Sequence, residues 1–78
     1  MSNIDIYRSI FIESLDIDEK DFKENLKYND IPEWDSIGHM TLMSAIEEKF
    51  NITLETDDVV DFDSFKKGIE LLKKYKVF

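Results

Sequence analysis

A serine stands where a loop is expected to end and a helix to begin, in residues 33–40, EWDSIGHM. A hydroxyl at a helix N-terminus is exposed and lies at the positive end of the helix dipole, where a phosphate ester is stabilised. No base stands near Ser36 in the sequence, and the Gly-x-Ser-x-Gly pattern of a nucleophile elbow is absent. Ser36 is therefore predicted to be modified by another enzyme rather than to act as a catalytic nucleophile. The alternative is that Ser36 only caps the helix.

Charge is distributed unevenly along the chain. The 78 residues carry 18 acidic and 10 basic side chains, for a net charge of −8. Residues 28–63, which include Ser36, hold ten acids and one base, whereas residues 64–78 hold five lysines and one acid. The acidic stretch repels phosphate, so nucleic acid is not expected as a partner. It favours partners with basic docking surfaces.

Metal and disulfide chemistry is not indicated. The chain has no cysteine and a single histidine, His39, which argues against disulfides and against a zinc site. Asp16, Asp18 and Asp21 suggest a calcium loop, but an EF-hand needs glycine sixth and glutamate twelfth, where this chain has Asp21 and Lys27. The four aspartates between residues 57 and 63 are predicted to form a solvated helix face that binds divalent ions only loosely.

The expected location is the cytoplasm. No run of apolar residues approaches the length that crosses a membrane. The first residues lack the basic start and the long apolar stretch of a signal peptide. The absence of cysteine fits a reducing compartment.

The elements that position Ser36 are predicted to be helices, because apolar residues recur at spacings of three and four. A single domain, residues 1–78, is expected. Helices are predicted over residues 3–15, from Asp35 or Ser36 to residue 50, over residues 56–61 and from about residue 65 onward. Thr56 is predicted to cap the third helix. Asn51 is expected to end the second in a left-handed conformation.

A long loop, residues 16–35, separates the first two predicted helices. Its apolar residues, Ile17, Phe22, Leu26 and Ile31, are spaced irregularly and are predicted to anchor the loop on the core. Tyr7, Ile10, Phe11 and Leu15 form the inward stripe expected of the first helix. Six further residues are predicted to pack against one another: Leu42, Ile46, Phe50, Phe65, Ile69 and Leu72.

The segment around Ser36 resembles the acyl carrier protein family. In that family an Asp-Ser-Leu or Asp-Ser-Ile motif opens the second helix, and an acidic pair followed by an aromatic closes it. The matching residues here are Asp35, Ser36, Ile37, Met40, Leu42, Ile46, Glu47, Glu48 and Phe50. Length, acidity, the long first loop and the final helix agree as well. The resemblance implies an all-α fold, a small four-helix bundle of acyl-carrier type with three main helices and one short third helix.

The resemblance also implies a function without catalysis. A phosphopantetheinyl transferase would move the 4'-phosphopantetheine arm from coenzyme A to Ser36, with Asp35 as the flanking motif residue. A ligase or acyltransferase would load an acyl or aminoacyl group as a thioester, for downstream enzymes with basic docking surfaces. A monomeric carrier would present this tethered substrate at raised effective concentration. Partner contacts are predicted at Trp34, Ile37, Met40, Glu47 and Glu48.

Two departures from the family pattern bear on the pathway. Many fatty-acid carriers place acids after the serine, where this chain has Gly38 and Thr41, so acids restored there are expected to improve use by fatty-acid synthase enzymes. Peptidyl carriers have a glycine pair before the serine, where this chain has Glu33 and Trp34. The Trp-Asp-Ser sequence resembles that of discrete carriers dedicated to one pathway. The resemblance implies a specialised lipid, polyketide, peptide or surface-polysaccharide pathway rather than housekeeping fatty acid biosynthesis.

The neighbours of Ser36 each have two interpretations. Trp34 either shields the arm or touches a partner, or it packs between the loop and the second helix, because most tryptophans are largely buried. His39 either contacts a partner or the phosphate, or it is a solvated helix residue. Ile37 and Met40 are either exposed apolar contacts or a partly buried helix edge.

A second hypothesis of a different class is a small acidic helical protein-interaction domain with no prosthetic group. The same acidic surface would bind a basic partner directly. The two hypotheses differ in whether Ser36 accepts a phosphopantetheine arm, which the intact mass of the protein reports.

Overall fold

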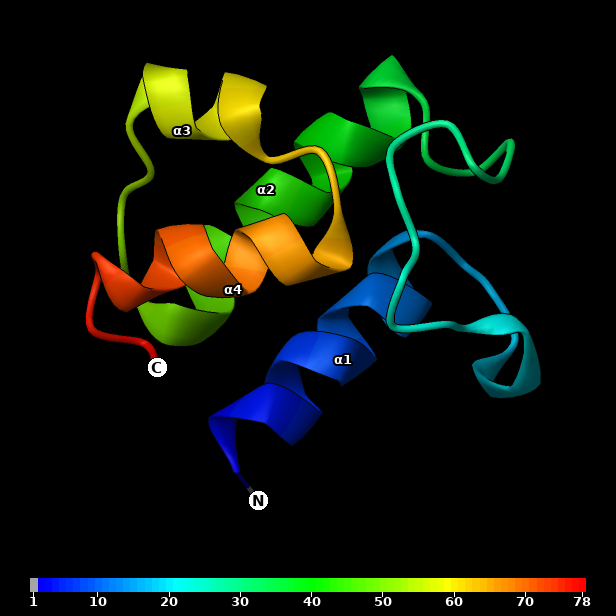
Figure 1. The fold of residues 1–78 in the computed structure, drawn as a ribbon, viewed down its shortest axis with the longest axis horizontal. Coiled ribbons are helices and arrows are strands. Elements are labelled where there is room, and N and C mark those ends of the chain that lie inside the picture. The colour runs from blue at the N-terminus through cyan, green and yellow to red at the C-terminus, as the bar shows by residue number, and fades with distance from the viewer. Residues whose placement is uncertain (1) are drawn as a thin grey trace.

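The part of the chain that the structure describes folds into four α-helices, which can be followed in order in Figure 1. The computed structural model describes residues 2–78 and contains α1 (Asn3–Ser14), α2 (Ser36–Phe50), α3 (Thr56–Asp61) and α4 (Phe65–Lys73). A short 3-10 turn lies at Glu19–Asp21, and the described residues contain no strand. None of the helices within residues 2–78 combines the length and the apolar character that a membrane span requires.

Local side chains set both ends of α2 and the start of α4. The Asp35 carboxylate accepts a hydrogen bond from the Gly38 N–H at 2.8 Å and caps α2, while Ser64 Oγ accepts one from the Lys67 N–H at 2.9 Å and caps α4. Asn51 ends α2 with a φ of 54°, in the left-handed region as predicted. These ends follow from residue types within three positions of each terminus.

The predicted cap of α3 is wrong. Thr56 is the first helical residue, and the capping position belongs to Glu55, whose side chain makes no capping hydrogen bond. Instead, the Glu55 N–H donates to the Tyr75 hydroxyl at 2.9 Å. A short helix of six residues is thus held at its start by a residue twenty positions away, which local sequence does not reveal.

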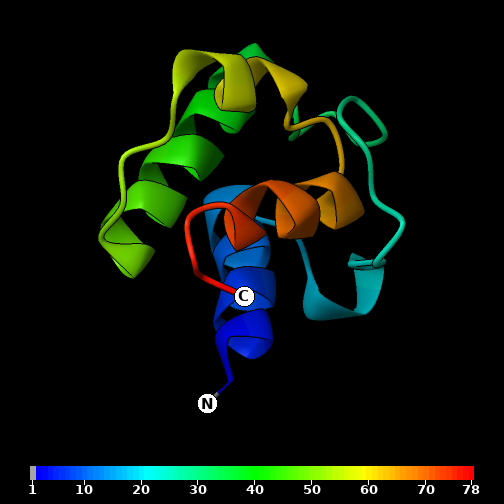
Figure 2. The ribbon, with the colours of Figure 1, turned by 60° about the vertical axis from the view of Figure 1, so that its left-hand side comes forward.

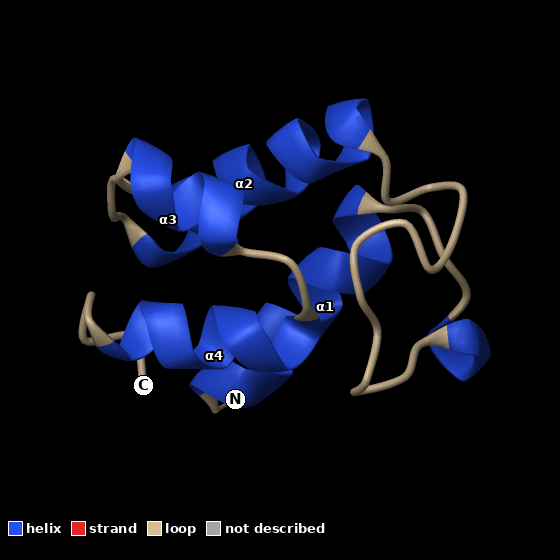
Figure 3. Cartoon of the chain, turned by 45° about the horizontal axis from the view of Figure 1, so that its top comes forward, coloured by secondary structure: helices blue, strands red, loops and turns tan. Residues whose placement is uncertain are grey.

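The helices form two groups around one core. In Figures 1 and 3, α2 and α3 lie on one side of the molecule, and α1 and α4 lie on the other. Among the described residues, the most extensive backbone contact between two helices is that of α1 with α2. The two ends of the described chain lie near each other (Figure 2). Asn3 Nδ2 donates a hydrogen bond to the Val77 carbonyl at 2.6 Å. Ser36, the first residue of α2, therefore lies on the side of the molecule formed by α2 and α3.

Aromatic rings fill the interior. Tyr7 stacks on Phe65 with ring centroids 4.6 Å apart and donates its hydroxyl to the Phe65 carbonyl at 2.7 Å. Burial raises the pKa of the Tyr7 hydroxyl far above its ordinary value. A Cβ atom at Gly68 would collide with the Tyr7 hydroxyl and with the Phe62 ring, so only glycine lets α4 approach α1 this closely.

The predicted core is largely confirmed. The stripe of α1 is buried, and so are four of the six residues predicted to pack together, namely Leu42, Ile46, Phe65 and Leu72. Phe50 and Ile69 are only partly buried and pack against the edge of this core. Phe50 is the last residue of α2, whereas Ile69 lies in the middle of α4.

The long loop is anchored as predicted and is also tied to α4 by backbone hydrogen bonds. Leu26 is buried, while Ile17, Phe22 and Ile31 are partly buried against the core. The Phe65 N–H donates to the Leu26 carbonyl at 2.9 Å, and the Tyr28 N–H donates to the Asp63 carbonyl at 2.8 Å. These two bonds fix residues 26–28 of the loop beside the start of α4, and from there the Tyr28 side chain reaches Ser36 at the start of α2.

Candidate functional site

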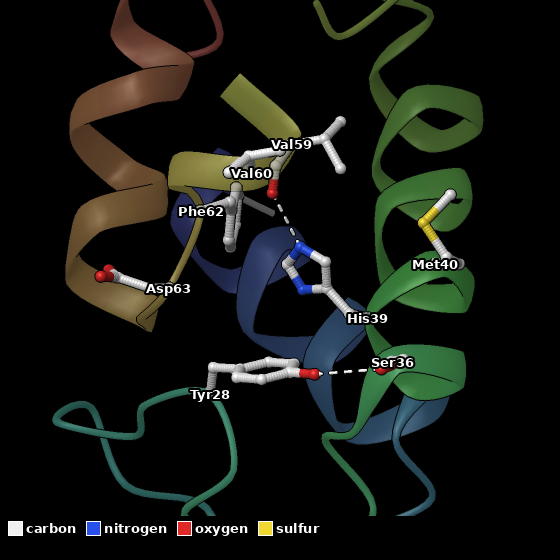
Figure 4. Close-up of a pocket in the computed structure, with 8 residues that line it drawn as sticks. All are labelled: Tyr28, Ser36, His39, Met40, Val59, Val60, Phe62 and Asp63. Atoms are coloured by element: carbon white, nitrogen blue, oxygen red, sulfur yellow. Dashed lines mark hydrogen bonds between the residues drawn. The ribbon is translucent and has the colours of Figure 1, made fainter. Parts of the chain in front are cut away.

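Ser36 is the first residue of α2, and its side chain is exposed. The capping role that was the alternative for Ser36 belongs to Asp35, so the serine hydroxyl is not needed to start the helix. Ser36 Oγ lies 3.3 Å from the Tyr28 hydroxyl, as Figure 4 shows. A phenol is no general base at neutral pH, so the geometry leaves a reachable but unactivated hydroxyl.

Gly38 is required by the turn that presents Ser36. A Cβ atom at this position would collide with the Glu33 carbonyl oxygen and would press on the Leu15 side chain. The missing acid at residue 38 therefore has a structural reason. Improved use by fatty-acid synthase enzymes after acids are restored at residues 38 and 41 stays a prediction, and the close contacts at Gly38 count against an aspartate there.

His39 is neither a solvated helix residue nor free to contact a phosphate. Its Nδ1 accepts a hydrogen bond from Trp34 Nε1 at 3.0 Å, and its Nε2 lies 2.9 Å from the Val59 carbonyl of α3. An indole N–H only donates and a carbonyl only accepts. The ring is therefore the neutral tautomer with its proton on Nε2, and it joins α2 to α3.

Trp34 lies in the core, and its predicted partner contact is wrong. The side chain is fully buried, with its ring edge against Phe11 at a centroid distance of 5.3 Å. The second interpretation, packing between the loop and α2, is confirmed. Because Trp34 directly precedes Asp35, its burial fixes the position of the chain just before the cap of α2.

Three large apolar side chains near Ser36 face solvent. Ile37 and Met40 of α2 are 78% and 57% exposed, which agrees with their interpretation as apolar contacts rather than as a buried helix edge. Val60 of α3 is 75% exposed and was not foreseen, because a valine pair in a short helix indicates burial as readily as exposure. We call these three residues the apolar rim.

A groove of about 340 Å³ opens beside Ser36 between α2, α3 and the long loop. Figure 4 shows Tyr28 and Ser36 at one end, His39 between the two helices, and the Asp63 carboxylate pointing away from the other labelled side chains. The residues that line it are Tyr28, Ser36, His39, Met40, Val59, Val60, Phe62 and Asp63. The predominantly apolar lining suits a hydrocarbon group rather than an ion.

The acidic pair lies at the far end of α2. Eleven and twelve residues separate Glu47 and Glu48 from Ser36, or about 17 Å along the helix axis. The Glu47 carboxylate accepts a hydrogen bond from the Leu54 N–H at 2.7 Å and thereby holds the loop after α2. Glu48 is exposed. The structure therefore separates the two predicted partner contacts, with Glu47 supporting the fold and Glu48 facing solvent.

The aspartates around α3 do not form one solvated face as predicted. Asp58 is buried and accepts hydrogen bonds from the Tyr75 hydroxyl and from Lys74 Nζ, the latter at 2.7 Å. The hydrogen bond from Lys74, followed by that from Tyr75, lowers the pKa of Asp58 below its ordinary value. Within residues 2–78, no group of three or more potential ligands is arranged to hold a metal ion.

Comparison with known proteins adds no family to this geometry. No protein-family model matches the chain, and a search among curated proteins finds no match. A proposal about function therefore rests on the sequence pattern around Ser36 and on the site that surrounds it.

Proposed function

We propose that this chain is an acyl carrier protein that bears 4'-phosphopantetheine on Ser36, in a four-helix bundle of acyl-carrier type. The observation that carries the proposal is an exposed serine on the first residue of a 15-residue helix whose cap is a different side chain. Attachment of the arm converts the hydroxyl to a phosphodiester, and negative charge is stabilised at a helix N-terminus.

The residues around Ser36 fit an attached arm. The hydroxyl faces solvent, so a transferase can reach it, and the groove beside it offers an apolar surface for the arm and its cargo. When bound, the arm supplies a terminal thiol that holds an acyl group as a thioester. The protein itself holds the start of α2 rigid through Asp35 and positions Tyr28 next to the modified oxygen.

The proposed partners are a phosphopantetheinyl transferase, a loading ligase or acyltransferase and downstream enzymes that use the thioester. The apolar rim of Ile37, Met40 and Val60 provides the contact close to Ser36. Acidic residues, Glu48 among them, steer basic partner surfaces towards it. The function is that of a carrier without catalysis, because the serine has no base and the only histidine is bound to Trp34 and Val59.

The experiment that tests the proposal is the intact mass of the protein after incubation with coenzyme A and a broad-specificity transferase. We expect one phosphopantetheine per chain in the wild type and none in Ser36→Ala. Ser44→Ala is the matched control, because Ser44 is an exposed serine of the same helix and should leave modification unchanged. Ser36→Ala should change the free energy of unfolding by less than about 0.5 kcal/mol, because Asp35 supplies the cap. An unmodified wild type with a cooperative melt would refute the proposal.

The second candidate function is an acidic protein-interaction domain without a prosthetic group. The observation that favours it is the apolar rim, since exposed apolar side chains next to acidic residues suit a direct protein contact. This function requires no reaction at Ser36. A protein that stays unmodified and binds a basic partner through Ile37 and Val60 would support it.

A further inference from the structure

The His39 ring closes the gap between α2 and α3. Trp34 donates to one of its nitrogens and the other donates to the Val59 carbonyl, so one ring satisfies two polar groups at once. The two rings lie edge to edge and nearly in one plane, with centroids 6.1 Å apart and planes 19° from parallel. Figure 4 shows it reaching from α2 towards the Val59 carbonyl. We call His39, Trp34 and the Val59 carbonyl the interhelical plug.

The interior behind the interhelical plug is filled. Phe62 is 2% exposed and packs edge-on against His39 at a centroid distance of 6.1 Å. Trp34 and Phe11 continue the packing towards α1. Within residues 2–78 no buried side-chain nitrogen or oxygen lacks a hydrogen-bond partner. The core therefore has no unsatisfied polar group that a change of packing would relieve.

We propose that the interhelical plug closes the core of this protein to its own cargo, so that the groove beside Ser36 accommodates a short acyl group and a long alkyl chain stays in solvent. This inference rests on the proposed carrier function and specifies its substrate class.

The physical reason lies in the hydrogen bonds that an entering chain would break. An alkyl chain that passed between α2 and α3 would have to displace His39, leaving the Trp34 N–H and the Val59 carbonyl without partners in an apolar interior. Unpaired buried polar groups are strongly unfavourable. The groove outside the plug needs no such change, and its volume of about 340 Å³ lies near the lower limit for small-molecule sites.

The test compares thioesters of different length on the intact protein. A broad-specificity transferase loads Ser36 with butyryl-, octanoyl- or dodecanoyl-phosphopantetheine from the matching acyl-coenzyme A. Cleavage by hydroxylamine is followed by intact mass, and each rate is divided by that of the same acyl-coenzyme A in solution. If the chain entered the core, each further pair of buried methylenes would protect the thioester by about tenfold. A closed core predicts normalised rates that agree within about twofold.

Nuclear magnetic resonance supplies an independent readout. The chain has one tryptophan, so its indole N–H gives one resonance, which should stay in place when dodecanoyl replaces butyryl. The Met40 methyl resonance should shift when butyryl is added to the arm, because Met40 lines the groove outside the plug. An unshifted Met40 methyl would overturn the assignment of the groove to the short acyl group.

Two variants test the role of the plug. His39→Ala removes the plug, and protection of the thioester should then rise with chain length. Ser44→Ala, at an exposed residue of the same helix that lies outside the groove, should keep the cleavage rate independent of chain length, as in the wild type. If folded His39→Ala showed no dependence of the normalised cleavage rate on acyl chain length, the proposed role of His39 would be overturned.

The wild-type series decides the inference even if His39→Ala does not fold. Length-dependent protection in the wild type, together with a shifted indole resonance, would overturn it and leave the carrier function standing. No modification of Ser36 at all would overturn both.

Discussion

Asp58 should stabilise this fold in a pH-dependent way. Its carboxylate accepts hydrogen bonds from Lys74 and Tyr75, and the Tyr75 hydroxyl also accepts the N–H of Glu55. The start of α3 is thus joined to the end of α4 through a buried charge. Asp58→Asn keeps the shape of the side chain and removes the charge, so it isolates the electrostatic share of these contacts.

The size of the effect follows from burial. Asp58 is 5% exposed, and a hydrogen bond to a charged group contributes about 1.5–3 kcal/mol. In a domain of this size 1 kcal/mol shifts the melting temperature by about 4–8 °C, so Asp58→Asn should lower it by about 6–24 °C at pH 7. The Lys74 side chain is 54% exposed, and solvent screening makes the loss in Lys74→Met smaller.

The pH dependence has a definite sign. The pKa of Asp58 is lower in the folded protein than its ordinary value of 3.8, so the folded state binds its proton less tightly than the unfolded state. Its stabilisation is complete well above pH 3.8 and is lost as the pH falls through the lower folded value. The wild type should therefore lose stability as the pH falls through this range. The melting temperature of Asp58→Asn should depend less on pH over the same range.

Circular dichroism melts between pH 3 and pH 7 check this prediction. Asp57→Asn is the matched control, because Asp57 is the adjacent residue, is exposed and also lies in the first turn of α3. It should cost at most about 1 kcal/mol through the helix dipole. Equal melting temperatures for the two variants at pH 7, or an unchanged dependence of the melting temperature on pH in Asp58→Asn, would refute the reasoning.

Two further predictions concern the helix that carries the modified serine. Gly38→Ala should destabilise the protein by about 1–3 kcal/mol in a denaturant titration, because the new methyl group collides with the Glu33 carbonyl. Modification of Ser36 by the transferase should also slow, because the chain before α2 has to shift. A Gly38→Ala variant as stable as the wild type would contradict the close approach seen here. Glu48→Lys should slow modification at low salt and flatten its salt dependence without a change in melting temperature, since Glu48 is exposed. Glu47→Lys should also lower the melting temperature, because it removes the hydrogen bond to Leu54, and equal melts for the two lysine variants would disprove that structural role.

Sequence patterns located most helix ends because those ends depend on neighbours in the chain. Asp35, Ser64 and Asn51 act on backbone groups within one turn, so their residue types suffice to place the ends of α2 and the start of α4. Amphipathic spacing likewise placed Tyr7 and Leu42 in the core. The exposed position of Ser36 at a helix start followed from the same local rules.

Tertiary contacts decided the features that give the site its character. Four features depend on groups from other parts of the fold: the need for glycine at residue 38, the burial of Trp34, the two hydrogen bonds of His39 and the ion pair of Asp58. Asp58 shows why sequence was insufficient. Its identity suggests a solvated aspartate, and only the folding of α4 beneath α3 brings Lys74 and Tyr75 to it, because residues 16 and 17 positions apart meet only when the helices pack.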